Sequence, residues 1–226
     1  LGSDDVVKTY TIEHGNSTRA RKWLYNVVTA LSFKFSKQNG CEVSGSTLGQ
    51  AITEGATWTS SGVTAAESPL VPIAGSHISV AFATSWTNLS SATVAPRAFS
   101  AEFNASDLIG PVWVMDGTNT GFAATVGRKP NITVKVLEEA DANGMAWLTN
   151  MRAGSTIWMR IKCQGPDIET GKPWLFQIDG CYSVGKPDAY SDQDGVYAIG
   201  WNLTPTYDPV ASKTIEFTER NKLAGL

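Results

Sequence analysis

The sequence predicts a mainly β fold, and three observations support this prediction. Apolar and polar residues alternate with a period of two in several segments, which is typical of strands with one buried and one exposed face. Residues 31–36 and 78–83 show the pattern most clearly. Dipeptides that tolerate positive φ separate the segments. A single segment has helical spacing instead, so the helix content is expected to be small.

Further strands are expected wherever the alternation recurs. They are predicted at residues 97–104, 131–138, 156–164, 173–182, 195–203 and 213–219. Turns are predicted at Asn39-Gly40, Asp116-Gly117, Asp179-Gly180 and Asp194-Gly195, because Asn-Gly and Asp-Gly adopt the backbone angles of tight hairpin turns.

One short helix is predicted over residues 143–153. Met145, Leu148 and Met151 recur three positions apart, behind Asn143 as the N-cap. Gly154 follows as a residue that can end a helix in the left-handed conformation.

The chain contains two stretches that resemble each other. Residues 8–13, 23–27 and 41–48 are echoed in the same order by residues 159–164, 174–178 and 196–203. This predicts a duplicated strand unit, with 1–55 as the end of a first copy, 56–75 as a linker or loop, and 76–226 as a second copy. The first copy begins halfway and the sequence has no initiator Met, so we expect an N-terminal portion to precede Leu1.

Composition and charge narrow the function classes. Charged residues make up 17% of the chain, and 21 acidic against 18 basic residues give a net charge of -3. This is not the basic footprint of a nucleic-acid or anionic-membrane binder. No apolar run approaches the roughly 18 residues of a membrane span, and the first residues do not resemble a signal peptide. We therefore expect a soluble protein that folds in a cytoplasm.

The three cysteines are predicted to be buried free thiols. Cys41, Cys163 and Cys181 are an odd number with wide spacings. Such spacing matches neither a disulfide framework nor a zinc motif.

No residue pattern points to catalysis. His14 and His77 lack partners at metal-ligand spacing, and residues 192–195 lack the glutamate of a calcium loop. Glu138 and Glu139 are adjacent, so they are expected on opposite faces of a strand. We predict that the chain is not an enzyme and binds no cofactor or metal.

Residues 105–129 are predicted to be irregular, with an apolar centre at 111–115. Loops of this length are usually functional, and an exposed apolar centre favours contact with a partner. The alternative is a flap over the protein's own core. Trp113 and Met115 are the candidate contact residues.

The eight tryptophans leave a sugar-binding platform open as an alternative, because exposed aromatic faces stack on pyranose rings. However, Trp23, Trp158, Trp174 and Trp201 lie in predicted strands or their echoes. Packing in a core or a subunit interface is the commoner role there.

The order and spacing of several segments in residues 77–226 resemble a known family. These segments are the helix ending in 151–154, the strand 156–161, residues 174–180, 194–199 and 203–208, and the strand 214–217. The chain is similar here to the major tail tube proteins of long-tailed, non-contractile bacteriophages, particularly those that infect actinobacteria.

The resemblance implies a tail-tube-type β-sandwich or barrel with a short flanking α-helix. Its strands would join those of neighbouring subunits into a barrel around a channel, and the rings would stack into the tube. Members with one copy form hexamers and members with two copies form pseudo-hexameric trimers, so the duplication favours a trimer.

The partners implied are further copies of the chain, the tape measure, tail tip and tail terminator proteins, and DNA in transient, non-specific passage. The chain would assemble in the host cytoplasm and reside in the virion tail, without a membrane. Trp113 and Met115 would make the inter-ring contact. A channel wall with more acidic than basic residues would let DNA slide. A lectin-like module and a capsid-decorating or other virion structural protein are the alternatives.

Overall fold

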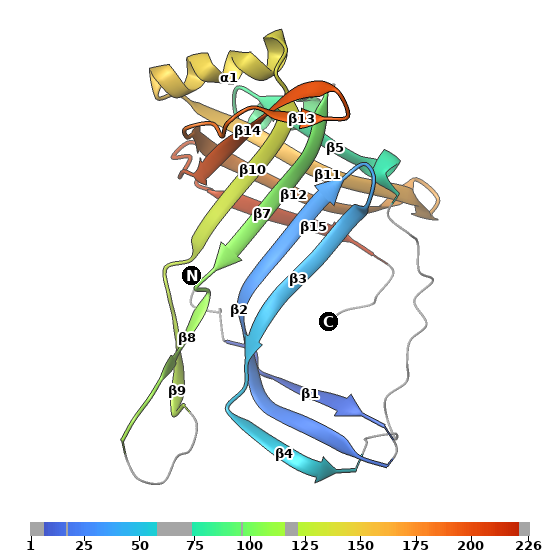
Figure 1. Ribbon diagram of the computed structural model, residues 1–226, viewed down its shortest axis with the longest axis vertical. Coiled ribbons are helices and arrows are strands. Elements are labelled where there is room, and N and C mark those ends of the chain that lie inside the picture. Colours follow the sequence, from blue (N-terminus) through green and yellow to red (C-terminus); the bar gives the residue numbers. More distant parts are fainter. Residues whose placement is uncertain (1–6, 17, 58–73, 96, 116–121, 222–226) are drawn as a thin grey trace. The chain divides into compact units, whose positions relative to one another are not determined.

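The fold is mainly β, as predicted. The computed structural model describes residues 7–16, 18–57, 74–95, 97–115 and 122–221 (Figure 1). Within these ranges the chain forms fifteen strands and one α-helix. The chain divides into two compact units. Unit 1 contains residues 1–32, 44–67 and 105–131, and unit 2 contains residues 33–43, 68–104 and 132–226.

The elements follow the chain in this order. The strands are β1 (Tyr10–Gly15), β2 (Ala20–Ser36), β3 (Gly40–Leu48), β4 (Ala51–Ala56), β5 (Ile78–Ala83), β6 (Thr93–Val94), β7 (Ala98–Ser106), β8 (Ile109–Val112), β9 (Ala124–Gly127), β10 (Asn131–Glu139), β11 (Thr156–Glu169), β12 (Lys172–Val184), β13 (Ser191–Gln193), β14 (Val196–Pro205) and β15 (Ile215–Arg220). The helices are η1 (Gly75–His77), η2 (Thr87–Ser91) and α1 (Ala142–Ala153).

Unit 2 is sandwich-like. One layer contains β5, β11, β12 and β15, and β7 and β10 pass in front of it in Figure 1, while β14 pairs with both β10 and β12. β12 continues from one layer to the other, because it pairs with β15 over residues 175–180 and with β14 over residues 182–184. The core between the layers is made by alternating side chains such as Val134 and Val136 of β10 and Met159 and Ile161 of β11. This alternation is the sequence signal that predicted the strands.

α1 covers one end of unit 2 through Trp147. The Trp147 ring meets Phe82 of β5 edge-on at 4.1 Å between centroids and stacks on Trp201 of β14 at 6.2 Å. Trp147 and Trp201 are both buried. Burial of a large aromatic side chain contributes roughly 2 to 3 kcal/mol, so this contact fixes the helix on the sheet.

The predicted helix is confirmed, but its N-cap is not Asn143. The Asp141 carboxylate caps the helix by accepting hydrogen bonds from the backbone N–H groups of Asn143 and Gly144, both at 2.9 Å. The helix begins at Ala142, one residue before the predicted start. The sequence did not decide between the two caps, because Asn and Asp are equally good N-caps. Gly154 ends the helix at φ 63°, as predicted.

The prediction of a turn at Asp179-Gly180 is wrong. Both residues are buried inside β12, where Asp179 pairs with Arg160 of β11. The Arg160 guanidinium donates to both Asp179 oxygens at 2.8 Å. A Cβ at position 180 would collide with the Tyr182 ring, so Gly180 allows this ring to pack closely. The Asp179 carboxylate is engaged in the ion pair with Arg160 and does not form a turn.

The other predicted turns have different outcomes. Asn39 ends the turn between β2 and β3, and Gly40 begins β3 at φ 76°. Asp194-Gly195 joins β13 to β14 with both residues at positive φ. Asp116-Gly117 lies outside the described residues. The stretch 105–129, predicted to be irregular, contains the antiparallel hairpin of β8 and β9. Short strands of four residues give too little alternation to be detected.

Unit 1 contains β1, β4, the β8–β9 hairpin and most of β2 and β3. β2 pairs with β1 on one side and β4 on the other. Tyr25 interrupts β2 at φ 53° beside an irregularity in the β1 register, which is the geometry of a β-bulge. The linker was predicted over residues 56–75, but β4 extends to Ala56. Most of the predicted linker, residues 58–73, lies outside the described residues. Whether the chain contains two copies of one unit stays a prediction.

Candidate functional site

Unit 1 has little core of its own. Among the described residues, 25 hydrophobic residues are buried, and only Ala20, Val27, Ala105 and Phe122 belong to unit 1. Of the sixteen large hydrophobic residues that are exposed, nine lie in unit 1. They are Tyr10, Ile12, Tyr25, Ile52, Val112, Trp113, Val114, Met115 and Val126. A concentration of exposed apolar side chains marks an interaction surface.

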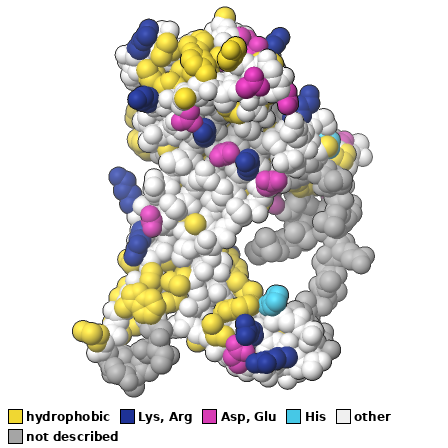
Figure 2. Space-filling view, viewed as in Figure 1, with side chains coloured by type: hydrophobic (Ala, Val, Ile, Leu, Met, Phe, Trp, Pro, Cys, Tyr) yellow, Lys and Arg dark blue, Asp and Glu magenta, His cyan; other side chains and the backbone are white. Residues whose placement is uncertain are grey.

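The β8–β9 hairpin carries the most exposed of these side chains. Trp113 follows β8 and is 64% exposed, and Met115 is fully exposed. The Trp113 ring meets Phe122 edge-on at 6.2 Å, while the Phe122 carbonyl accepts a hydrogen bond from Gln50 Nε2 at 2.5 Å. Figure 2 shows hydrophobic side chains gathered over this hairpin. An isolated two-stranded sheet is only marginally stable in water, so this surface gains stability when it is covered.

A second apolar surface of unit 1 is a hollow of about 400 Å³ over β1, β2 and β4. Ile12, Trp23 and Ile52 line it, together with Asn26, Thr47 and Gly49. Asn26 is buried, and its side-chain amide donates to the backbone carbonyls of Tyr10 and Trp23 at 3.2 and 2.7 Å. These bonds fix the bulge in β2, so the hollow has a defined shape.

Several strands have one assigned neighbour within the described part of the chain. β4 pairs with β2 alone, and β15 pairs with β12 alone. On β15, Phe217 is half exposed and stacks among Phe33, Phe103 and Phe176 in unit 2. Backbone N–H and C=O groups on the outer edge of such strands can pair with another chain.

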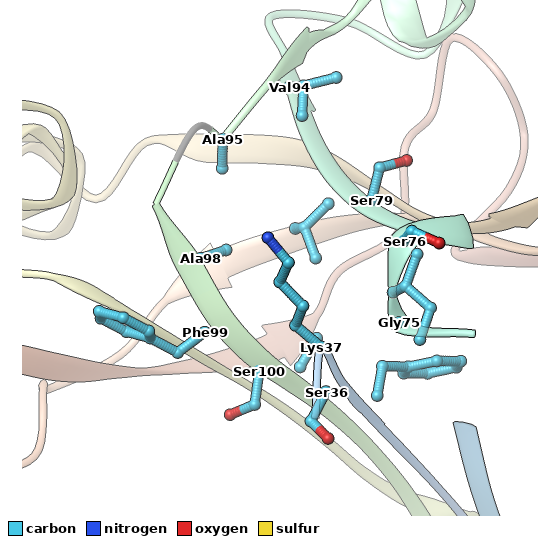
Figure 3. A pocket seen from close by; sticks show the side chains of 14 residues that line it. Ser36, Lys37, Gly75, Ser76, Ser79, Val94, Ala95, Ala98, Phe99 and Ser100 are labelled. Carbon is cyan, nitrogen blue, oxygen red and sulfur yellow. The ribbon is translucent and has the colours of Figure 1, made fainter. Parts of the chain in front are cut away.

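Unit 2 contains a cavity of about 260 Å³ beside the β2–β3 turn (Figure 3). Phe35, Ile78 and Val80 give it an apolar floor, and Ser36, Ser79 and Ser100 give it a polar rim. The Lys37 side chain extends across its mouth in Figure 3.

The titratable groups do not form a catalytic constellation in the described residues. Glu138 is buried, and Glu139 on the other face of β10 pairs with Arg97, as expected for adjacent residues of a strand. His14 is exposed, and the Nδ1 atom of His77 is buried without a hydrogen-bond partner. No group of three or more His, Cys, Asp or Glu side chains in these ranges could hold a metal ion.

Burial raises the pKa of Glu138 to about 7, with a smaller contribution from the charge of Asp141. Its Oε2 atom has no hydrogen-bond partner among the described residues. Glu138 lies beneath the first turn of α1, where a Cβ on Gly144 would come within 3.5 Å of its side chain. Asp141 acts on this carboxyl through its charge and not through a hydrogen bond, so among the described residues Glu138 is a structural group that responds to pH.

The cysteine prediction is confirmed for Cys163 and Cys181, which are buried and free. Cys41 is only partly buried, so full burial is wrong for this residue. It lies at the start of β3, where the strand leaves the turn. The thiols of Cys41 and Cys163 are hydrogen-bonded to each other, a contact between distant positions that the spacing could not reveal.

Six of the seven described tryptophans are at least partly buried, and Trp113 is the exposed one within those ranges. Trp158 donates from its indole nitrogen to Asp208 at 2.7 Å. Such placements favour packing over a multi-tryptophan sugar platform. The carbohydrate-binding alternative stays a prediction that binding assays can address.

Comparison with known proteins gives no match, neither to a protein family nor to a curated protein. In the described ranges, α1 and the shorter helices are all too short or too polar to cross a bilayer.

Proposed function

We propose that this chain is a virion structural protein that polymerises into stacked rings and forms a phage tail tube through which DNA passes. The observation that supports the proposal most is the composition of unit 1, whose described residues include nine exposed large apolar side chains and only four buried hydrophobic ones. Burial of each such side chain contributes roughly 1.5 to 3 kcal/mol. A surface of this kind favours self-association over a monomeric state.

The edge strands β4 and β15 provide the proposed lateral contact between subunits. Among the described strands, β4 and β15 each pair with one neighbour, so neighbouring copies could pair with the backbone groups of their outer edges. Repetition of one such contact around a closed ring leaves no open edge, whereas an unclosed contact produces irregular aggregates. Sheet-to-sheet pairing within a ring is therefore the proposed lateral contact. The trimeric ring rests on the predicted duplication.

Contact between rings is proposed for the β8–β9 hairpin. Trp113 and Met115 follow β8, and Gln50 holds the other side of the hairpin loop through its bond to the Phe122 carbonyl. A large aromatic residue and a flexible thioether are enriched at the centres of protein interfaces. The hairpin thus has the composition of an inter-ring anchor.

DNA passage requires a wall that does not retain phosphate. The chain has 21 acidic and 18 basic residues, and many of its described cations are already paired with carboxylates, for example Lys34 with Glu102 and Arg160 with Asp179. Paired cations release few counterions from DNA, so they bind it weakly. A lumen with more acidic than basic residues is the proposed arrangement.

Negative-stain electron microscopy of the purified protein tests the proposal. Hollow tubes with a regular axial repeat are expected, together with rings at low concentration. A carbohydrate-binding module would remain monomeric and bind a glycan array, and a capsid-decorating protein would bind capsids without forming tubes. Monodisperse monomers at all protein concentrations would refute the assembly function.

A further inference from the structure

The end of the β2–β3 hairpin is packed closely against the sheet of unit 2. Phe35 of β2 stacks on Phe176 of β12 at 6.3 Å between ring centroids. At the turn, a Cβ on Gly75 would collide with the Lys37 carbonyl, so the two backbones touch. Ser36, Lys37, Gly75 and Ser76 lie together beside the cavity in Figure 3. These contacts place the residues that follow the turn.

Cys41 follows this turn directly and contacts Cys163 of β11. Cys163 lies between Ile78 of β5 and Phe176 of β12 in the sheet register. The two thiols are hydrogen-bonded, and neither is in a disulfide. Cys163 is 0% exposed, whereas Cys41 is partly open to solvent. The pair therefore combines one accessible and one enclosed sulfur.

We propose that Cys41 and Cys163 are a reversible disulfide site, in which Cys41 reacts with a soluble disulfide and Cys163 completes the internal bond. The site is independent of the tail tube function. The ligand class is a small-molecule disulfide such as oxidised glutathione, which supplies the oxidising equivalents.

The reaction has two balanced steps. The Cys41 thiolate attacks one sulfur of the soluble disulfide, forms a mixed disulfide and releases one small thiolate. Cys163 then loses its proton to water, and its sulfur attacks Cys41 Sγ, forming the Cys41–Cys163 bond and releasing the second small thiolate. Two protein thiols are oxidised and one small disulfide is reduced to two thiols.

The electrostatics of the pair assign the order of attack. The hydrogen bond from Cys163 lowers the pKa of Cys41 against the opposing effects of burial and of Glu42. The same hydrogen bond, together with burial, raises the pKa of Cys163. Cys41 reacts first, because it is the sulfur that solvent can reach and because the thiolate is the nucleophile. Burial also raises the pKa of Cys181, which keeps this third thiol unreactive in the folded chain.

The internal bond would tie the hairpin end to the core of unit 2. It closes a loop of roughly 120 residues, and long loops give the largest stabilisation from a crosslink in the chain-entropy model. A rise in the melting temperature of about 5 to 15 °C is expected for a chain of this size. An oxidising environment would then stabilise the protein after it leaves a reducing one.

Titration of the native protein with an aromatic disulfide that releases a coloured thiolate tests the proposal. The wild-type chain is expected to release two equivalents of coloured thiolate and retain no reagent, with a Cys41–Cys163 crosslinked peptide in mass spectrometry. Cys163→Ala is expected to release one equivalent and keep the reagent on Cys41. Cys41→Ser is expected to release none.

Cys181→Ala is the matched control, because it removes a buried thiol outside the pair and should titrate like the wild type. Oxidised glutathione should reproduce the crosslink and the rise in melting temperature. A stable mixed disulfide on wild-type Cys41, a crosslink that includes Cys181, or two separately capped thiols would each overturn the proposal. Absence of any reaction in the native wild type would also overturn it.

Discussion

Replacement of Glu138 by glutamine should remove a pH dependence of stability that this one carboxyl creates. Glu138 is 2% exposed, and its Oε2 atom lacks a hydrogen-bond partner among the described residues. Burial, assisted by the charge of Asp141, raises its pKa from 4.5 to about 7. The folded chain thus holds a proton that the unfolded chain has already released over this range.

The sign of the effect follows from proton linkage. Because the folded state binds more protons, the free energy of unfolding falls as pH rises from about 4.5 to about 7. The stabilisation is complete below the unfolded pKa and is lost as pH rises through the folded pKa. A difference from 4.5 to about 7 corresponds to about 3 kcal/mol. α1 is the element that this loss should loosen, since it covers Glu138.

Urea unfolding followed by tryptophan fluorescence, between about pH 5 and pH 8, measures the dependence. Wild type should lose about 3 kcal/mol over this interval, whereas Glu138→Gln should have a much flatter profile and be the more stable chain at the alkaline end. Glu139→Gln is the matched control on the exposed face of the same strand, and it should keep the wild-type slope. Equal slopes for Glu138→Gln and wild type would refute the reasoning.

Two further predictions concern the assembly surface and the core. Trp113→Ala should leave the melting temperature of the isolated chain within about 3 °C while shortening the tubes seen by electron microscopy; tubes of normal length and stability would remove Trp113 from the contact. Asp179→Asn should destabilise unit 2 by about 3 to 5 kcal/mol, because the Arg160 side chain, 20% exposed, loses its bidentate partner. Chemical denaturation checks this, with Asp167→Asn at an exposed position of β11 as the control, and a loss below about 1 kcal/mol would contradict it.

Sequence patterns predicted the elements in which one physical signal dominates. β10 was visible because Val134, Val136 and Glu138 share its buried face, and α1 was visible from its spacing and Gly154. Glu138 itself shows the limit of the pattern. Alternation alone predicts an apolar residue at this buried position, and the tertiary contact with α1 that buries the carboxyl cannot be read from the sequence.

Features that depend on contacts between distant residues were not predictable. Asp179-Gly180 has the composition of a turn, yet the Arg160 ion pair holds it inside a strand. The Cys41–Cys163 contact arises from the way the β2–β3 turn packs on Gly75, which no local spacing encodes. The hydrophobic surface of unit 1 was anticipated only at residues 111–115, because its other members are spread over β1, β2, β4 and β9 and no local pattern shows that they are exposed together.

The central claim is that strands with one neighbour among the described residues, such as β4 and β15, are completed by other copies. Amide hydrogen exchange on assembled and dissociated protein tests it most directly, because it reports the pairing of each backbone N–H. We predict that amides of β4 or β15 exchange quickly in the dissociated chain and become strongly protected on assembly, while the β10 amides stay protected in both states. Equal exchange of β4 and of β15 in the two states would contradict the account.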